Sequence, residues 1–432
     1  MSEQIGLVTI DPESYLYPVV ESALTAAIPG IKIKKLLDDK DSGKKVIQYG
    51  EYEDLDFDRI MSDTENYLAC SYVYRKALIR KHFLANTIAV YTAKNPDSIL
   101  NMAVPESYNL EVDYAEFLDD SLDDAYELRC ELENNEGEDK APKTFILKPS
   151  MSDRGQGIRL FRSIDELQAI FDSFEEDSSS EEEEDNEAEI SEAEKTYGES
   201  LKAPVMTEKD DDDNNGVITS QLRHFIVQKY IPNVLLLPEH ENRKFHIRTY
   251  VVASGALKVY VFKEMLALFA LSPYKDPSTL SVSEEDSMIP LHGQLTNTCL
   301  QGEQKDENSV HLFWQLKGLS DAAKEQIYSE LCEVTGELFK AALGGGSFFQ
   351  PLPNAFEIYG LDFLVTEDHH VSLLEVNAYP DFKQTGEVFK RVVIDELFNS
   401  VAKTVVAPFF GNPGTESEKL NLVLEKDVSG GW

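Results

Sequence analysis

Two apolar runs separated by a short polar turn place the strongest constraint on the fold of this chain. They lie within Phe356 to Asp381, with the turn at Thr366 to His370, and this pattern is typical of a β-hairpin. Asp362 and Glu375 are then expected to lie opposite each other, with Asn377 on the same face as Glu375. Two carboxylates in otherwise hydrophobic strands are costly unless a cation or a basic partner compensates their charge.

The polar side chains of this hairpin predict one of two arrangements. Asp362, Glu375 and Asn377 offer the hard oxygen ligands that Mg²⁺ requires when it bridges nucleotide phosphates. A salt-bridged strand pair is the alternative, because strand carboxylates often pair with Lys or Arg. The hairpin alone does not decide between these two interpretations.

Charge and composition exclude several classes of protein. The 432 residues suffice for two or three packed units, and a content of 42% hydrophobic and 28% charged residues is typical of a globular protein. A formal net charge of -39 opposes affinity for nucleic acid phosphates and for anionic lipid. The segment Met1 to Ile10 lacks the pattern of a signal peptide, and no apolar run approaches the ~20 residues of a membrane helix. We therefore expect a cytosolic or nuclear protein. The four cysteines lie far apart without a C-x-x-C pair, which signals neither a zinc site nor a disulfide framework.

An acidic interval divides the chain. Every charged residue between Glu175 and Glu194 is acidic, and Asp210 to Asp213 adds a second run. Such a composition cannot bury enough apolar surface to fold, so we expect a disordered insertion at about 175–216. The polar tail from Pro413, interrupted by Leu420 to Leu424, is expected to be loosely attached.

The patterns on either side of the insertion predict both helices and strands. The segment from Ile5 to about Asp54 is expected to form a small α/β unit. A long helix is predicted at Leu316 to Ala342, where apolar residues recur at helical spacing, and it should cover one face of a mainly antiparallel sheet. That sheet is predicted from five β-rich runs: Phe225 to Tyr230, Phe245 to Val252, Leu257 to Phe262, Phe356 to Val365 and Val371 to Val376.

Further segments suit an anionic nucleotide. In the loop Pro149 to Gly157, glycines let backbone N–H groups approach a phosphate, although an ordinary hairpin turn is the alternative. Lys244, His246 and Arg248 alternate along one predicted strand, so they share a face that suits phosphate or carboxylate. The strand end at Val227 to Ile231 is a candidate edge for adenine.

The order of these motifs resembles that of a known family. K-P-S and R-G-Q-G-I are followed by V-Q-K-Y-I, K-F-H-I-R, Q-L-T-N, Y-G-L-D-F and L-L-E-V-N-A-Y-P. This series is similar to the tubulin tyrosine ligase-like family of ATP-grasp enzymes, from about Tyr72 to Ala407. The resemblance implies an α+β ATP-grasp fold, with N-terminal and central α/β subdomains and a C-terminal antiparallel sheet flanked by helices. The subdomains would span 1–70, 71–233 and 234–410, followed by a tail at 411–432.

The resemblance also implies which residues form the site, with ATP and Mg²⁺ as cofactors. The implied metal ligands are Asp362, Glu375 and Asn377. The implied catalytic residues are Lys148, Lys244 and Arg248. The implied nucleotide-binding residues are Lys76, Lys148, Gln228, Lys229, Tyr230, Ile231, Lys244, His246, Thr296 and Asn297.

The implied reaction makes a peptide or amide bond. The γ-phosphate passes to a protein carboxylate, and an amino acid then attacks the acyl phosphate, with Mg²⁺ and basic side chains neutralising the phosphate oxygens. His246 stands where the family usually has Asp, and Lys263 where it usually has Arg, so nucleotide binding is better preserved than substrate recognition. Two alternatives are a scaffold with weak or no catalysis and a small-molecule ligase of the glutathione-synthetase sort.

The resemblance extends to partners and location. Fungal members of the family that associate with RNA-processing bodies carry a domain of this kind, and the acidic character of this chain is similar to theirs. This implies a cytoplasmic protein, in P-bodies, whose partners are mRNA-decay factors or a protein substrate, with tubulin as one conceivable substrate. No direct contact with nucleic acid or membrane is expected.

Overall fold

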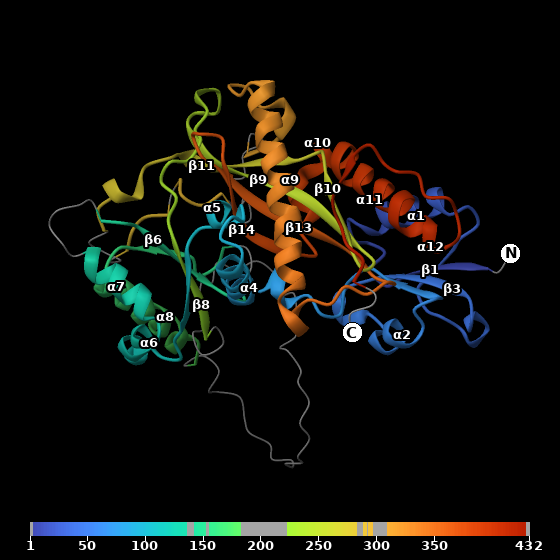
Figure 1. Ribbon diagram of the computed structural model, residues 1–432, viewed down its shortest axis with the longest axis horizontal. Coiled ribbons are helices and arrows are strands. Elements are labelled where there is room, and N and C mark those ends of the chain that lie inside the picture. The colour runs from blue at the N-terminus through green and yellow to red at the C-terminus, as the bar shows by residue number, and fades with distance from the viewer. Residues whose placement is uncertain are drawn as a thin grey trace, which may run out of the picture. The chain divides into compact units, whose positions relative to one another are not determined.

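Three β-sheets organise the part of the chain that the computed structural model describes, which comprises residues 3–135, 142–152, 155–182, 223–282, 288–291, 293–296 and 309–428. The chain forms two compact units (Figure 1). The first unit contains Met1–Ser107, Gln228–Leu280 and Pro290–Trp432, and the second contains Tyr108–Val227 and Ser281–Ile289.

A parallel four-stranded sheet opens the first unit. Its strands are β1 (Gln4–Val8), β2 (Lys32–Lys34), β3 (Lys45–Tyr49) and β4 (Tyr67–Ala69), in the order β2-β1-β3-β4. Helix α1 (Tyr17–Ala27) begins with Pro18 in its first turn, a position at which proline has no hydrogen bond to lose. Its buried face joins Val8 and Ile47 in one apolar cluster. The small α/β unit predicted for this segment is confirmed.

A seven-stranded antiparallel sheet forms the centre of the first unit. Its strands are β9 (Arg243–Ser254), β10 (Lys258–Phe262), β11 (Leu266–Pro273), β12 (Val310–Leu312), β13 (Phe356–Val365), β14 (Val371–Ala378) and β15 (Leu420–Glu425). Strand β9 pairs with β13 on one side and with β10 and β11 on the other. Its residues are buried from Arg243 to Ala253, as expected for a strand in the middle of a sheet that is covered on both faces.

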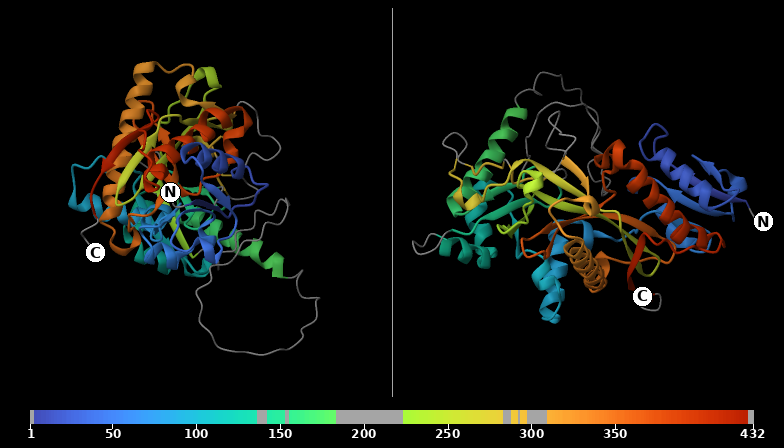
Figure 2. Two further views of the ribbon diagram at one scale, coloured as in Figure 1. Left: turned by 90° about the vertical axis from the view of Figure 1, so that its right-hand side faces the viewer. Right: turned by 90° about the horizontal axis from the view of Figure 1, so that it is seen from above.

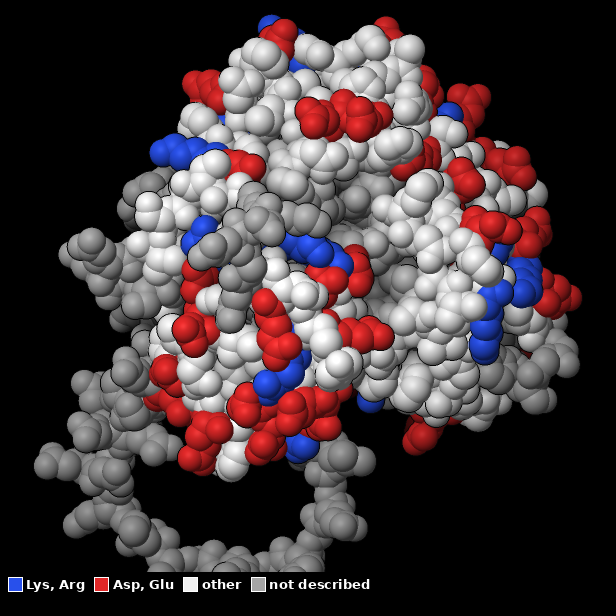
Figure 3. Space-filling view, turned by 60° about the vertical axis from the view of Figure 1, so that its left-hand side comes forward, with Lys and Arg blue, Asp and Glu red and all other residues white. Residues whose placement is uncertain are grey.

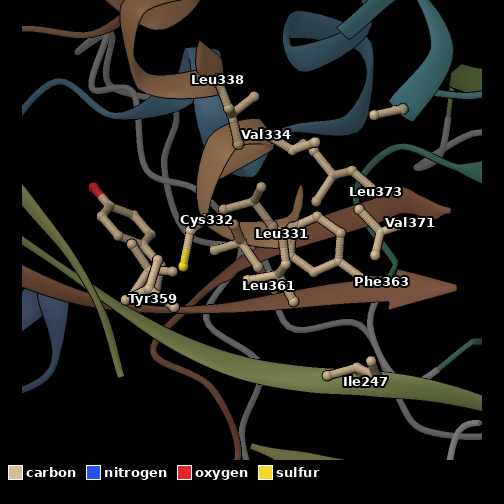
Figure 4. Close-up of a cluster of buried hydrophobic side chains, with 14 of the residues drawn as sticks. Ile247, Leu331, Cys332, Val334, Leu338, Tyr359, Leu361, Phe363, Val371 and Leu373 are labelled. Carbon is tan, nitrogen blue, oxygen red and sulfur yellow. The ribbon is translucent and has the colours of Figure 1, made fainter. Parts of the chain in front are cut away.

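Helix α9 (Asp321–Leu343) covers one face of this sheet (Figures 1 and 4). Leu331, Val334 and Leu338 of α9 lie over apolar side chains of β13 and β14 (Figure 4). The helix begins after Ser320, whose hydroxyl accepts a hydrogen bond from the Ala323 N–H and so caps the first turn. The predicted helix is confirmed, but it begins at Asp321 because of this cap.

The second unit is built around a separate four-stranded sheet. Its order is β5-β8-β6-β7, with β5 (Ser107–Glu111), β6 (Phe145–Pro149), β7 (Arg159–Phe161) and β8 (His224–Lys229). Helices α6 (Leu118–Asp124), α7 (Tyr126–Asn135) and α8 (Ile164–Glu182) contribute to its apolar core. The placement of Phe225 to Tyr230 in the large antiparallel sheet is therefore wrong. An alternating apolar pattern identifies a strand but not its partner, which here is distant in sequence.

Two further predictions, the acidic insertion and the loose tail, can be compared with the structure. Helix α8 continues to Glu182, inside the predicted acidic insertion, while residues 183–222 lie outside the described residues. The expected loosely attached tail is wrong for Leu420–Glu425, because this segment is strand β15 and pairs with β10. Leu420 and Leu424 are buried by that pairing.

Short helices complete the first unit: α2 (Phe57–Ser62), α3 (Lys76–Ile79), α4 (Lys81–Lys94), α5 (Leu100–Ala103), α10 (Gly386–Phe389), α11 (Glu396–Val401) and α12 (Ala407–Phe409). Helix α11 lies beside α1, so the C-terminal and N-terminal parts of this unit pack together (Figure 2). None of the helices described here combines the length and the apolarity needed to cross a membrane.

Candidate functional site

The hairpin β13–β14 places its two carboxylates side by side. Asp362 lies opposite Glu375, and Gly360 opposite Asn377, so both predicted relations are confirmed. A change of register follows Asp362, which corresponds to a β-bulge, a feature often found next to active sites. On its other side β13 pairs with β9, where Arg248 lies directly opposite Asp362. Cross-strand partners share a face, so Asp362 lies between a carboxylate and a guanidinium.

Arg248 and Asp362 form a buried, two-pronged ion pair. Arg248 Nε donates to Asp362 Oδ1 at 2.5 Å and Nη2 donates to Oδ2 at 2.9 Å, with side chains 9% and 6% exposed. Burial by itself lowers the pKa of Arg248, but the Asp362 carboxylate raises it above its usual value. Gly360 makes room for this pair, because a Cβ there would lie 3.4 Å from Arg248 Cδ and 2.9 Å from Pro380 Cβ. The salt-bridged strand pair left open by the sequence is thus present.

His246 lies on the same face, two residues before Arg248. Its Nδ1 is 2.6 Å from Thr296 Oγ1. Its Nε2 is 3.6 Å from Asp362 Oδ1, which is too long for a hydrogen bond, and this buried nitrogen has no other hydrogen-bond partner among the described residues. Burial lowers the pKa of His246, with Asp362 acting in the opposite direction, so the ring is neutral near pH 7.

Asn377 and Lys81 surround the second carboxylate. Asn377 Nδ2 donates to Asp362 Oδ2 at 3.4 Å and to Glu375 Oε1 at 3.2 Å. Lys81 Nζ, at the start of α4, is 3.6 Å from Glu375 Oε2. Lys76, which the sequence predicted as a phosphate contact, is exposed at the start of α3. Lys81 belongs with Lys76 to one basic stripe of the sequence, Arg75 to Lys81, and only the fold shows that Lys81 lies beside Glu375.

Lys244 is held by a hydrogen-bonded chain at the other end of the row. Its Nζ donates to Tyr230 OH at 2.9 Å and lies 4.5 Å from the centre of the Tyr230 ring. Tyr230 OH in turn donates to Gln294 Oε1 at 2.6 Å. Burial raises the pKa of Tyr230, so its hydroxyl remains a donor. The predicted adenine segment and the predicted phosphate row therefore meet at Tyr230.

The remaining predicted site residues lie in several places. Gln228 Nε2 donates to Ser107 Oγ at 2.9 Å, and Lys229 Nζ donates to Glu106 Oε2 at 2.5 Å. Ile231 is half-buried. Lys148 lies in strand β6 of the second unit and is buried, while Asn297 lies outside the described residues. The structure brings together the side chains of Lys244, His246, Arg248, Thr296, Asp362, Glu375 and Asn377.

The site is rich in charge but has few metal ligands. Among the residues that the structure describes, no group of three or more His, Cys, Asp or Glu side chains is placed to hold a metal ion. Two carboxylates and one amide suit an ion that takes its other ligands from phosphate and water, which is how Mg²⁺ binds in nucleotide sites. Carboxylate oxygens also retain lone pairs after accepting one hydrogen bond. The donor set therefore fits Mg²⁺ accompanied by a nucleotide better than a bare ion. On the face shown in Figure 3, Asp and Glu predominate over Lys and Arg.

Comparison with known proteins now identifies the family. Residues 58–413 match the tubulin-tyrosine ligase family. The chain belongs to this family. It is 47% identical over 439 residues to the probable tubulin–tyrosine ligase PBY1 of Saccharomyces cerevisiae. The aligned region covers 99% of this chain but only 55% of that relative, so the chain spans about half of the relative's length. It is 46% identical over 401 residues to the probable tubulin–tyrosine ligase C12B10.04 of Schizosaccharomyces pombe, covering 90% of this chain and 92% of the relative.

A solved structure agrees with the family assignment. It is the C-terminal domain of K. lactis Pby1, described as an ATP-grasp enzyme that interacts with the mRNA decapping enzyme Dcp2. The match has a TM-score of 0.70 and 41% sequence identity, and it covers 98% of this chain and 99% of that domain. The predicted α+β ATP-grasp fold of the tubulin-tyrosine ligase family is confirmed.

Proposed function

We propose that this chain binds Mg-ATP over the face of β9, β13 and β14 and acts as a carboxylate–amine ligase that joins an amino acid to a protein carboxylate. The observation that carries the proposal is the row Lys244, His246 and Arg248 facing the carboxylates of Asp362 and Glu375, all on one face of one sheet. Basic donors for phosphate and oxygen ligands for Mg²⁺ are needed together at such a site.

Each residue has a definable task in this proposal. Asp362, Glu375 and Asn377 would hold Mg²⁺, with the Asn377 amide turning its oxygen toward the ion. Arg248 offers a planar fork that matches phosphate and carboxylate equally well, while Lys244, fixed by Tyr230, is a point charge for phosphate. ATP would supply the phosphate that activates the acceptor carboxylate. Lys148 and Lys76 remain proposed phosphate contacts.

Transfer of an amino acid to protein tests the ligase proposal. Purified chain is incubated with Mg-ATP, a mixture of radiolabelled amino acids and a cell extract freed of small molecules. We expect label in protein that depends on ATP and on Arg248. The Arg248→Met variant should lose the labelling, whereas Lys258→Met, which changes an exposed lysine of β10 in the same sheet, should keep it. ATP binding without any labelled protein would contradict the ligase activity.

A second function is favoured by the K. lactis structure, whose protein interacts with Dcp2. The chain would then serve as a cytoplasmic scaffold for mRNA-decay proteins in P-bodies, with or without catalysis. A pull-down with purified Dcp2 and the Glu375→Ala variant separates the two roles. A pure scaffold retains Dcp2 on that variant at the wild-type level. Loss of Dcp2 by a folded Glu375→Ala variant would contradict it.

A further inference from the structure

The two oxygens of Asp362 are not equally supported. Both accept a hydrogen bond from Arg248, at Oδ1 and at Oδ2. Oδ2 has Asn377 Nδ2 as a second donor at 3.4 Å, whereas no second hydrogen bond to Oδ1 exists among the described residues. If Arg248 turned to a phosphate, Oδ1 would lose its donor while Oδ2 kept one. A buried carboxylate oxygen without a donor is destabilising.

His246 is the side chain placed to replace that donor. In the β9–β13 register, Leu364 is the direct partner of His246, so His246 lies diagonally across from Asp362, within reach of its carboxylate. The His246 Nε2 atom is buried and lies 3.6 Å from Oδ1, and no residue in the described part of the chain forms a hydrogen bond with it. Lys244, which is also on this face, donates to Tyr230 OH at 2.9 Å.

The position of the Asp362 carboxylate favours one tautomer of His246. Thr296 Oγ1 lies 2.6 Å from His246 Nδ1, and because a hydroxyl can either donate or accept, this contact is compatible with both tautomers. Asp362 Oδ1 is an acceptor near Nε2, so it favours the proton of the neutral ring on Nε2, and Thr296 then donates to Nδ1. Nε2–H is therefore a hydrogen-bond donor, and a shift of Nε2 by roughly half an ångström would bring it within hydrogen-bond distance of Oδ1.

We infer that His246 is a positioning residue that takes over Asp362 Oδ1 when a nucleotide phosphate draws Arg248 away. Because the guanidinium fork fits a phosphate as well as a carboxylate, Arg248 exchanges one partner for the other. His246 keeps Asp362 fixed during this exchange, so that the remaining oxygen lone pairs would stay available to Mg²⁺. This inference rests on the proposed function and adds a role for the buried Nε2 atom of His246.

Two variants of His246 separate the two ring nitrogens. A glutamine amide reaches about as far as Nε2, whereas an asparagine amide reaches only to the position of Nδ1. We expect His246→Gln to bind a fluorescent ATP analogue with Mg²⁺ within about threefold of wild type. His246→Asn should bind it more weakly by a factor on the order of ten, the effect of one lost hydrogen bond. Without Mg²⁺ the two variants should differ much less. Equal affinity of both variants for the Mg²⁺ complex would overturn the inference.

A spectroscopic measurement on the wild-type chain does not depend on the folding of variants. With ¹⁵N-labelled histidine, we expect His246 to be protonated on Nε2, and the Nε2–H proton to move downfield when Mg²⁺ and a non-hydrolysable ATP analogue are added. A proton on Nδ1, or an unchanged Nε2–H signal in the saturated complex, would contradict the exchange.

The double variant Asp362→Asn with Glu375→Gln shows which proposal has failed. If it binds Mg-ATP like wild type, the metal site and the proposed function are wrong. If it loses binding while His246→Asn does not, only the role of His246 is wrong.

Discussion

The buried pair of Arg248 and Asp362 predicts a large and specific loss of stability when the arginine is removed. In Arg248→Met, Asp362 keeps its charge in a place that is only 6% exposed, and Asn377 becomes its main donor. Breaking one side of a buried ion pair typically costs about 3–5 kcal/mol, because an uncompensated charge remains.

Urea unfolding of the nucleotide-free chain at pH 7 measures this effect. Lys258→Met is the matched control, because Lys258 forms an ion pair with Glu425 across strands of the same sheet, but with side chains 50% and 58% exposed. It should cost no more than about 1 kcal/mol. The double variant Arg248→Met with Asp362→Leu should recover much of the loss, since no charge is left unpaired. The reasoning is refuted if Arg248→Met destabilises the chain no more than Lys258→Met does.

Three further predictions concern other parts of the first unit. Gly336→Ala should lower the thermal unfolding temperature of the chain, because a Cβ there would lie 2.9 Å from the Val423 carbonyl oxygen of β15. Alanine favours helix over glycine, so a gain in stability would contradict this packing. Hydrogen bonds from Lys32 and Lys44 lower the pKa of Glu3 to about 2 from 4.5, so its contribution to stability is present above about pH 4.5 and is lost as the pH falls toward 2. A midpoint near 4.5 in an NMR titration of Glu3 would contradict the pairing. Burial raises the pKa of the Cys70 thiol to about 12, so Cys70→Ser should leave the rate of iodoacetamide labelling of the native chain at pH 8 unchanged, and a marked fall in that rate would show that Cys70 is reactive.

The sequence was sufficient to predict the hairpin and its polar face. Alternation along β13 and β14 and the short turn between them determine which residues lie opposite each other, so the relation of Asp362 to Glu375 followed from local rules. The helix α9 and the N-terminal α/β segment were predicted for the same reason, because their periodicities are local.

What the sequence did not predict depends on pairings between distant segments. Arg248 and Asp362 are separated by more than a hundred residues, and only the β9–β13 register makes them partners. The segment of β15 was expected to be a loose tail because its apolar residues are few. It is nevertheless ordered as a strand, because it pairs with the edge of β10. The position of Lys81 beside Glu375 was not predicted either, because the basic stripe Arg75 to Lys81 alone does not show which of its lysines lies near the hairpin.

Binding of ATP, measured by isothermal titration calorimetry with and without Mg²⁺, tests the central claim most directly. The variants are wild type, Asp362→Asn with Glu375→Gln, and the control Glu425→Gln, which changes a strand carboxylate that pairs with a lysine elsewhere in the same sheet. We expect wild type and the control to bind Mg-ATP equally, and the double variant to bind it at least about tenfold more weakly, a difference of about 1.4 kcal/mol. Wild-type affinity for Mg-ATP in the double variant would contradict the claim that this face of β13 and β14 holds the nucleotide's metal ion.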